Sequence, residues 1–351
     1  MIKPRKAIEK LEAYNPPIEN RGNSLRMDFN ENTVGPSPKV VEAIKNISRD
    51  YVSCYPEYNA FKKKLAKYLR VKESQVIPTN ASDDGIKVIM DTYIEEGDEI
   101  IIPEPTFPMF RIYAGIADAK IISMLYNEDL SFPTAKVLSA INDKTKIIVV
   151  VNPNNPTGTP VKRADIIKIL EKSKSAKNSI VLLDEAYHHF TKETGIDLIG
   201  KYENLIVVQT FSKVFGLAGL RIGYIISSEQ NIRNIKKACS PYSVNSIAVL
   251  AASAALDDEN YIEWYVSEVE KSRELLYQEL KKLGIKAYPS SANFILAYFG
   301  NKSKEIMDKL KQDGILIRDR SSDKMLNGCI RISLGTVEQT KKFLGHLKTV
   351  L

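Results

Sequence analysis

Between about residues 60 and 230, short runs rich in isoleucine and valine alternate with longer amphipathic stretches. The short runs are hydrophobic almost without interruption, which is typical of strands buried on both faces of a mainly parallel sheet. Most of the stretches between them, such as Arg163 to Lys174, have helical spacing. The pattern therefore predicts a layered α/β domain. Its predicted strands are Glu99–Ile102, Ile121–Met124, Lys146–Val151, Ile180–Asp184, Leu205–Thr210 and Ile222–Ser227.

A second, smaller α+β domain is predicted beyond the last of these strands. A long helical pattern runs from Asn245 to Gly284, and the acidic pair at 257–258 is where it would break in two. The final helix of the chain opens with Thr336 and Gln339, which match a capping box. The other predicted elements are the strand Asn293–Phe299, the helix Lys302–Asp313 and the strands Ile315–Arg318 and Cys329–Leu334.

The length and composition fit this division. With 351 residues, of which 44% are hydrophobic and 26% charged, the chain can form two domains and bury a large core. We expect an N-terminal arm over residues 1–30, a large domain over 31–245, and a linking helix with the small domain over 246–351.

Charge and cysteine usage argue against several classes of function. The net charge is +7, but the densest basic cluster, Lys62–Lys64, lies in a helical pattern and is interpreted as a solvated surface, not a nucleic-acid patch. The three cysteines lack the spacing of a zinc site or a disulfide framework. The start, MIKPRKAIEK, has no signal-like apolar stretch, and no apolar run is long enough to cross a bilayer. We therefore expect a cytosolic protein with no membrane contact and no metal.

Polar motifs lie where the predicted strands end, which is where open α/β sheets bind ligands. Lys213 follows a buried strand directly and has Phe215 and Leu217 nearby; a desolvated amine is more easily deprotonated and can then form a Schiff base with an aldehyde. Asp184 ends another strand, where a carboxylate is costly unless it meets a cation. The motifs are NPNNPTG (152–158), LDEAY (183–187), TFSKVFGLAGLRIGY (210–224) and NASDDG (80–85).

A phosphate monoester would suit the other groups of these motifs. Arg221, Thr210 and Ser212 supply a cation and two hydroxyls close to the candidate lysine in the sequence. Ser82 and Asp83 lie at a predicted helix start, where free backbone N–H groups attract an anion. A plain helix N-cap explains that last pair equally well.

One cofactor, pyridoxal 5′-phosphate (PLP), would use all of these groups together. Its ring nitrogen would be the cation for Asp184, and both Tyr187 and Asn155 could bond its phenolic oxygen. Each residue also has a simpler interpretation: Lys213 as a surface lysine, Asp184 as a helix cap or, with Glu185, a metal ligand, and Asn155 as part of a turn.

The order of these motifs resembles that of fold-type I PLP-dependent aminotransferases of class I/II, and most closely the histidinol-phosphate aminotransferase group. The resemblance covers nearly the whole chain and implies a large domain with a mainly parallel seven-stranded sheet, a smaller α+β domain and transaminase activity. Further segments that carry it are DFNENTVGPSP (28–38), CYPEY (54–58), PEPTFPMF (103–110), IRDR (317–320) and GCIRISLGT (328–336).

The resemblance also implies roles for single residues. Lys213 would bind the cofactor and carry the proton between the substrate carbon and the cofactor. Phe107 would stack on the cofactor ring. Tyr55 would reach the PLP phosphate of the neighbouring subunit, so the resemblance implies a homodimer.

Arg331 is the predicted site of the substrate's acidic group. In CIRISL, Ile330 and Ile332 share one strand face, which puts Arg331 on the other, where its guanidinium could grip a carboxylate or a phosphate. An arginine on an exposed edge strand is the simpler alternative. The resemblance places Arg318 beside Arg331, and it places two aromatic residues near the substrate side chain: Tyr14 and Tyr242.

The chain departs from its relatives at several positions that lie close to the motifs. Thr33 and Val34 replace a proline and an aromatic residue, and Ala81 replaces a glycine. DEAY is followed by His188 and His189, which could be a metal pair or an acid–base device. With only three histidines in the chain, we expect instead that one of the two is exposed and the other packed.

The predicted reaction is the ping-pong conversion of histidinol phosphate and 2-oxoglutarate to imidazole-acetol phosphate and glutamate, a step of histidine biosynthesis. Three alternatives stay open: an aminotransferase for aromatic amino acids, one for another small phosphorylated amine, and a threonine-phosphate-decarboxylase-like PLP enzyme. A regulator built on an inactive scaffold is disfavoured, because Lys213, Asp184 and Arg221 are all present.

Overall fold

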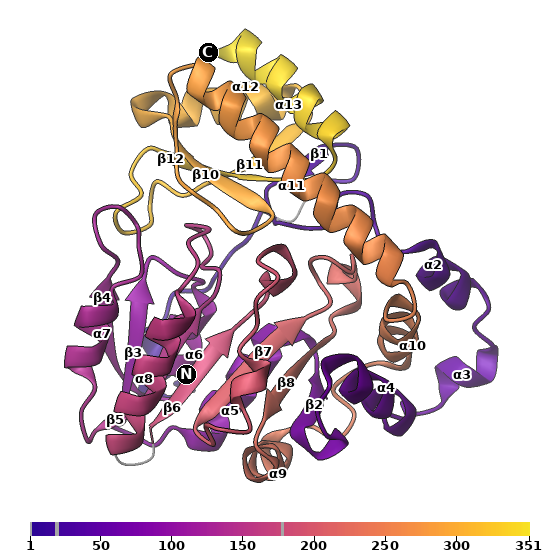
Figure 1. Ribbon diagram of the computed structural model, residues 1–351, viewed down its shortest axis with the longest axis vertical. Coiled ribbons are helices and arrows are strands. Elements are labelled where there is room, and N and C mark those ends of the chain that lie inside the picture. The colour runs from indigo at the N-terminus through magenta and orange to yellow at the C-terminus, as the bar shows by residue number, and fades with distance from the viewer. Residues whose placement is uncertain (1, 18–20, 177–178) are drawn as a thin grey trace.

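The computed structural model describes residues 2–17, 21–176 and 179–351, which form two layered bodies (Figure 1). The larger body contains a seven-stranded sheet in the order β2-β8-β7-β6-β5-β3-β4. The five strands from β7 to β4 are mutually parallel, and β8 is antiparallel to both of its neighbours. The strands are β2 (Val76–Thr79), β3 (Glu99–Glu104), β4 (Lys120–Leu125), β5 (Thr145–Val151), β6 (Ile180–Asp184), β7 (Leu205–Thr210) and β8 (Gly223–Ser227).

Helices cover both faces of this sheet, because its central strands are apolar on both sides. Successive residues of β6 belong alternately to two buried clusters: Leu182 to one and Leu183 to the other. The first cluster includes side chains of α5 (Ala81–Tyr93), α6 (Met109–Ile116) and α9 (Glu229–Ala238). The second includes side chains of α4 (Asn59–Leu69), α7 (Thr134–Ala140), α8 (Arg163–Ser175), α10 (Ser246–Ala255) and α11 (Glu259–Lys282).

The smaller body is built on a five-stranded sheet in the order β1-β11-β12-β10-β9. Its edge strand β1 comes from the start of the chain and pairs in parallel with β11, while the other pairs are antiparallel. Helix α11 runs from the larger body to this sheet (Figure 1). The elements are β1 (Leu25–Met27), β9 (Lys286–Ala287), β10 (Phe294–Tyr298), α12 (Ser303–Gln312), β11 (Ile315–Asp319), β12 (Cys329–Ser333) and α13 (Val337–Val350).

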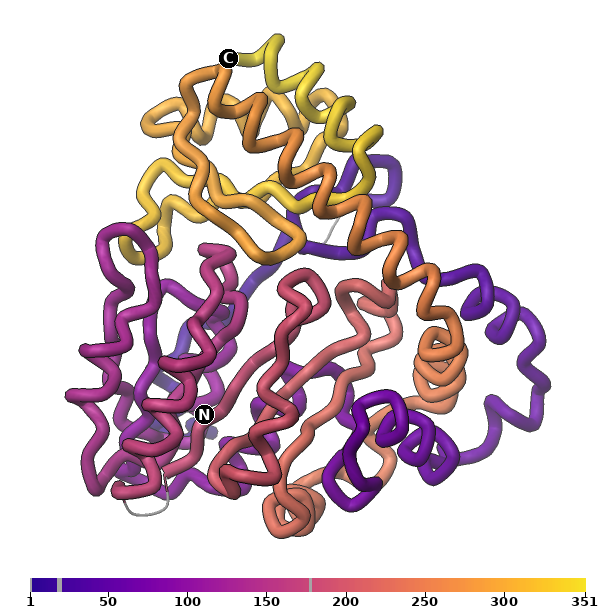
Figure 2. The backbone as a smooth tube through the Cα atoms, in the orientation of Figure 1, coloured from indigo at the N-terminus to yellow at the C-terminus, as the bar shows by residue number. Residues whose placement is uncertain are grey.

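The segment before β2 lies against both bodies (Figure 2). Helix α1 (Lys6–Glu9) begins beside the larger body, where the Arg5 guanidinium donates a hydrogen bond to the Ile116 carbonyl. The chain then reaches the small sheet as β1 and returns through α2 (Pro38–Lys45) and α3 (Arg49–Ser53) to α4. Among the residues that the structure describes, no helix is both long and apolar enough to cross a membrane.

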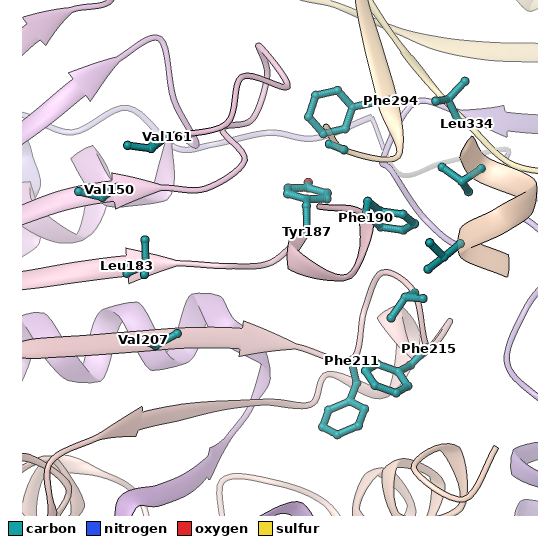
Figure 3. Close-up of a cluster of buried hydrophobic side chains, with 14 of the residues drawn as sticks. Val150, Val161, Leu183, Tyr187, Phe190, Val207, Phe211, Phe215, Phe294 and Leu334 are labelled. Carbon is teal, nitrogen blue, oxygen red and sulfur yellow. The ribbon is translucent and has the colours of Figure 1, made fainter. Parts of the chain in front are cut away.

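Aromatic side chains join the cores of the two bodies. Figure 3 shows Tyr187 and Phe190, which follow β6, next to Phe294 of the small sheet. The rings of Tyr187 and Phe294 meet edge to face with centroids 5.2 Å apart. Because both rings are at most 4% exposed, the interface next to this pair is packed like a protein interior.

Most of the secondary structure predicted from the sequence is confirmed. Strands β6 and β7 have the predicted bounds, and the other seven predicted strands differ by one or two residues at one or both ends. The helical pattern beyond residue 245 breaks at 257–258 as predicted, and Thr336 and Gln339 form the predicted capping box. The sequence did not predict β1, β2 and β9, which are only three, four and two residues long. The division at residues 30 and 245 stays a prediction.

The double burial of the large sheet leads to a stability prediction. We expect Leu182→Ala, in the centre of β6 and fully buried, to lower the free energy of unfolding by about 2–5 kcal/mol, because it removes packed atoms and leaves a cavity. The matched variant Leu125→Ala changes the edge strand β4, where the side chain is 44% exposed, and should change stability far less. Urea unfolding of both variants at one protein concentration measures the difference; equal losses would contradict it.

Candidate active site

A cavity of about 690 Å³ lies at the carboxyl ends of the parallel strands, between the two sheets. Three of its lining residues are placed there by successive strands: Asp184 ends β6, Thr210 ends β7, and Asn155 follows β5. Parallel strands bring such residues together because their carboxyl ends meet at one edge of the sheet. The small sheet contributes arginines from β11 and β12, and the segment after β1 forms a further wall.

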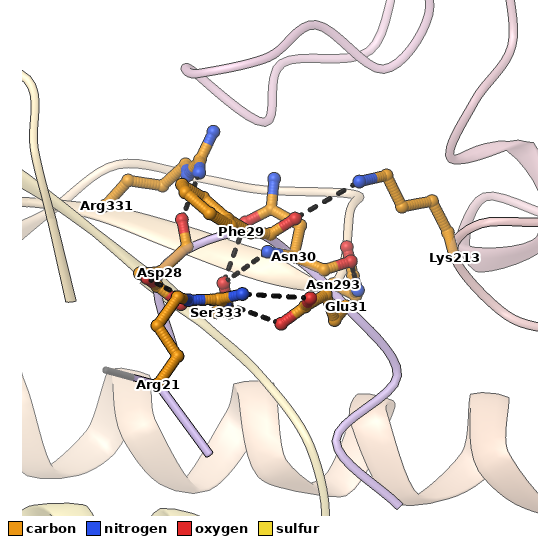
Figure 4. Close-up of polar contacts among 9 residues, drawn as sticks. All are labelled: Arg21, Asp28, Phe29, Asn30, Glu31, Lys213, Asn293, Arg331 and Ser333. Carbon is orange, nitrogen blue, oxygen red and sulfur yellow. Dashed lines mark hydrogen bonds and ion pairs between the residues drawn. The ribbon is translucent and has the colours of Figure 1, made fainter. Parts of the chain in front are cut away.

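Lys213 lines this cavity three residues beyond the end of β7. Its side chain is half-buried, and its amine donates a hydrogen bond of 3.2 Å to the carbonyl of Phe29 (Figure 4). The amine also lies 5.5 Å from the centroid of the Tyr187 ring. The structure therefore places a primary amine at the cavity, and a main-chain carbonyl orients that amine.

Asp184 is buried at the base of the same cavity. Its carboxylate accepts a hydrogen bond of 2.9 Å from the backbone N–H of Ala186. Burial raises the pKa of Asp184 to about 6, although the Ala186 N–H and the positive charge of Lys213 act in the opposite direction. A carboxylate in this environment favours a ligand that brings a positive charge.

Glu185, the next residue, belongs to a different network that points away from the cavity. Its carboxylate accepts hydrogen bonds from the hydroxyl of Thr194, the backbone N–H of Gly195 and the amide of Gln209. Burial raises its pKa to about 7 despite these donors. Its partners are therefore protein groups, and the alternative in which Asp184 and Glu185 bind a metal is not favoured.

Tyr187 and Asn155 both line the cavity, and their hydrogen bonds are arranged by neighbours. The side-chain amide of Asn30 donates to the Tyr187 hydroxyl at 3.0 Å, which leaves the hydrogen of that hydroxyl free for another acceptor. The Asn155 carbonyl oxygen accepts from Arg331, so its amide group remains available as a donor. Both residues can therefore donate a hydrogen bond to a ligand in the cavity.

The predicted anion-binding groups gather at the start of α5. The hydroxyl of Thr210 donates to that of Ser212 at 2.9 Å, and Arg221 forms an ion pair of 2.7 Å with Asp83. The sequence predicted the backbone N–H of Asp83 as its contribution; the structure adds this side-chain contact. Ser82 lies beside them on the cavity wall.

Two backbone features allow α5 to begin so close to β8. A Cβ atom on Gly223 would meet the Ser82 nitrogen at 2.6 Å, so only glycine fits at this point of β8. Ala81 has a φ of +70°, a left-handed conformation that costs a non-glycine residue about 1–2 kcal/mol. This explains why glycine is the expected residue at that position of the motif.

Arg331 projects from β12 into the cavity, as its strand position predicted. It is 5% exposed and donates to the Asn155 side chain. It also donates to the Asp28 carbonyl (Figure 4). Arg318 on β11 lies directly opposite it in the strand register, and its guanidinium is 3.5 Å from the Tyr14 hydroxyl. Burial lowers the pKa of Arg331 to about 10, and the neighbouring arginines act in the same direction.

Three aromatic residues of the prediction occupy different places. Phe107 lines the cavity and packs edge to face on Phe110. Tyr55 and Tyr242 lie outside the cavity lining and stack on each other, with ring centroids 4.3 Å apart. They are 75% and 54% exposed, respectively. Within one chain, the structure therefore does not bring these two tyrosines to the site.

The expectation of one exposed and one packed histidine is wrong, because His188 and His189 are both half-buried and lie against each other. Their ring centroids are 3.9 Å apart; His188 bonds the Glu185 carbonyl and His189 the Tyr68 hydroxyl. Burial lowers the pKa of His188 to about 4 and that of His189 well below its usual value, so both rings are neutral near pH 7. Neither lines the site, and the described residues contain no cluster of three or more metal-binding side chains.

Three residues of the site did not emerge from the sequence as candidates. Asn30 bonds both bodies and has a φ of +56°, and Arg21 pairs with the carboxylates of Asp28 and Glu31 at 2.7 Å. Arg320 lines the cavity beside Arg318. The only sequence signal for Asn30 and Arg320 was their membership of the DFNEN and IRDR segments, and Arg21 lies in none of the motifs.

The donor set of the cavity fits PLP. A buried carboxylate faces it without a cationic hydrogen-bond partner among the described residues, and a primary amine stands across from that carboxylate. Hydroxyls, an arginine and the start of α5 supply donors for a phosphate group. Phe107 supplies a ring surface.

Comparison with known protein families agrees with this chemistry. The sequence profile of the class I and II aminotransferases matches residues 23–347. Histidinol-phosphate aminotransferase of Caldanaerobacter subterraneus is 35% identical over 352 residues, covering 99% of this chain and 98% of that protein. The enzyme of the same name from Methanocaldococcus jannaschii is 36% identical over 337 residues, covering 93% of this chain and 89% of its own.

Solved structures share the architecture. Histidinol-phosphate aminotransferase of Sinorhizobium meliloti, in complex with pyridoxal-5′-phosphate, superposes with a TM-score of 0.89 at 25% identity and covers all of this chain and 98% of its own. L-threonine-O-3-phosphate decarboxylase of Porphyromonas gingivalis superposes with a TM-score of 0.80 at 22% identity, covering 92% of this chain and 98% of its own, and shares the fold alone. The extent of the sequence match, over a fold with this cavity, shows that the chain belongs to the class I and II aminotransferase family.

Proposed function

We propose that this protein is a PLP-dependent aminotransferase that converts histidinol phosphate and 2-oxoglutarate to imidazole-acetol phosphate and glutamate. The observation that carries the proposal is the meeting of the Lys213 amine, the Asp184 carboxylate and the Arg331 guanidinium in one cavity. The relatives named above support the choice of substrate, since they carry the name histidinol-phosphate aminotransferase over 89% or more of their own length.

The chain's own groups would bind each part of the cofactor. Lys213 would bond its aldehyde carbon, and Asp184 would face its ring nitrogen. Tyr187 and Asn155 would donate to its phenolic oxygen, and Phe107 would cover its ring. When bound, the cofactor supplies an electron sink for the negative charge that forms on the substrate carbon. Its phosphate would meet donors at the start of α5 and after β7: Ser82, Asp83, Thr210, Ser212 and Arg221.

Proton transfer in the reaction falls to Lys213. With substrate bound, the amine of Lys213 would be the group that accepts a proton from the substrate carbon and returns it. The Phe29 carbonyl, which bonds the amine at 3.2 Å, limits where it can turn. The same residues act in both half-reactions, because the amino group stays on the enzyme between the two substrates.

Arg331 would hold the acidic group of either substrate. Its guanidinium can bind a carboxylate or a phosphate through two parallel hydrogen bonds. The Asn155 side chain connects the two binding functions. Its carbonyl oxygen accepts from Arg331, which would hold the acidic group of the substrate, and its amide group would donate to the cofactor. Tyr14, beside Arg318, would cover the substrate; Tyr242 would do so only from a neighbouring subunit.

A substrate panel on the purified holoenzyme tests this proposal. Histidinol phosphate should change the absorbance of the bound cofactor and support turnover with 2-oxoglutarate. No change with histidinol phosphate, but a clear one with an aromatic amino acid or another phosphorylated amine, would overturn the substrate. Carbon dioxide release from phosphothreonine without 2-oxoglutarate would overturn the reaction. Lys213→Ala should fold and abolish turnover, while Lys237→Ala, on the far helix α9, should not.

Asp184→Asn should have opposite effects on activity and on stability. It should lower kcat/KM by about two orders of magnitude, because breaking one half of a buried charge pair costs about 2–5 kcal/mol. In the cofactor-free protein at pH 8 it should raise the free energy of unfolding by about 1–3 kcal/mol, because the raised pKa of Asp184 means that burial of its charge destabilises the fold.

The pH dependence checks the sign of this effect. A carboxylate whose pKa is higher in the folded protein than in the unfolded protein destabilises the fold most at high pH, where it is charged. The stability advantage of the Asp184→Asn variant should therefore shrink as the pH falls from about 6 to about 4, where both side chains are neutral. Urea unfolding of the two cofactor-free proteins at several pH values measures it. A constant difference would contradict this account.

We also propose a homodimer in which Tyr55 reaches the neighbouring site. Support comes from the exposure of an apolar surface on and after α3, where Val52 and Tyr55 are 61% and 75% exposed. Tyr242 stacks on Tyr55 and would accompany it. The free thiols of the chain support the predicted cytosolic location of such an enzyme.

Mixed dimers test the shared site directly. Lys213→Ala dimers should be inactive and Tyr55→Ala dimers weakly active, but a heterodimer has one site with both changes and one with neither. Mixing the two proteins should restore about a quarter of wild-type activity at statistical exchange. The matched control is a double variant that carries both Lys213→Ala and Tyr55→Ala in every chain and is taken through the same mixing procedure. No gain on mixing, with exchange shown by differently tagged subunits, would contradict the proposal.

A further inference from the structure

Three arginines share the face of the small sheet that borders the cavity. Arg318 on β11 lies directly opposite Arg331 on β12. Arg320 is two residues farther along, so it projects to the same side. Its backbone N–H bonds the Cys329 carbonyl at 3.0 Å, which continues the strand pairing beyond the end of β11. All three side chains line the cavity.

Arg320 is buried and only partly satisfied by the protein. It is 7% exposed, and its guanidinium contacts the carboxylate of Asp323. Its Nε has no hydrogen-bond partner among the described residues, and neither has the Nε of Arg331. A buried donor without a partner is costly, so the protein groups alone do not satisfy these arginines. Lys324 anchors the same turn to Glu104 of β3 at 2.7 Å.

The charges of this group do not balance. Arg318, Arg320 and Arg331 carry three positive charges and Asp323 one negative charge, which leaves two positive charges. Like charges directly opposite on neighbouring strands repel. Arg21, the next cation along the cavity wall, belongs to a separate cluster with the carboxylates of Asp28 and Glu31 (Figure 4).

We propose that Arg320 is a specificity-determining residue: together with Arg318 and Arg331 it forms a grip for a phosphate monoester dianion and favours it over a single carboxylate. A carboxylate has two oxygens and one charge, and one guanidinium satisfies it. A phosphate monoester has three terminal oxygens and a charge between about −1.5 and −2 near pH 7. The third arginine therefore matters for a phosphorylated substrate and much less for an amino acid.

This inference rests on the proposed function for its substrate, but its first test needs no substrate. The probe is inorganic phosphate, and its Kd on the holoenzyme is measured by calorimetry. Arg320→Gln should raise that Kd about tenfold or more, because a hydrogen bond to a charged group is lost. Asp323→Asn should lower it, because it removes the one negative charge of the group. Arg233→Gln, on the exposed surface of α9, should leave it unchanged.

Opposite effects of the two variants separate recognition from folding. If Arg320 only held the turn in place, both variants would weaken phosphate binding, and that result would overturn the inference. Kinetics give a second readout: Arg320→Gln should lower kcat/KM for histidinol phosphate about tenfold and that for glutamate less than about threefold. Equal losses for both substrates would also overturn it.

The failure of the proposed function would look different. If histidinol phosphate is not a substrate but the two variants still move the phosphate Kd in opposite directions, the grip stands and another phosphorylated amine is the substrate. If histidinol phosphate is turned over and the phosphate Kd does not depend on Arg320, the function stands and the grip is wrong.

Discussion

The position of the small sheet relative to the large sheet depends on contacts that include the hydrogen bonds of Asn30. Its backbone N–H and its side-chain oxygen both bond the Ser333 hydroxyl, and its carbonyl accepts from Asn293, so it is fixed to the small sheet. Its side-chain amide donates to the hydroxyl of Tyr187, which follows β6 of the large sheet. One residue, held in a left-handed conformation, thus bonds groups of both bodies beside the cavity that Lys213, Asp184 and the arginines line.

The site carries costs that a ligand would relieve. Asp184 is a buried carboxylate with a raised pKa, and the arginines of the small sheet stand opposite one another with a single neighbouring carboxylate. Groups of this kind destabilise a fold that has nothing to bind. Their positions match the two parts of the proposed chemistry, a cationic ring nitrogen at the base and an anionic substrate group at the top of the cavity.

By contrast, the network around Glu185 is internally satisfied. Three donors hold its carboxylate, and the hydroxyl of Tyr224 donates to the amide oxygen of Gln209 behind it. The neutral rings of His188 and His189 pack beside this network. The two histidines, which the sequence left open to metal or acid–base interpretations, are therefore part of the support behind Asp184.

The sequence by itself determined six of the seven strands of the large sheet, because short uninterrupted runs of Ile and Val between helical patterns are typical of strands buried on both faces. It also predicted Lys213, Asp184 and Arg331, since each stands at a strand end or on a strand face where its charge needs a partner. Only the tertiary structure decided that Arg331 meets Asn155, 176 residues away, and that Arg21, Asn30 and Arg320 belong to the site. Local patterns fix the face on which a side chain lies, but long-range packing alone decides which faces meet.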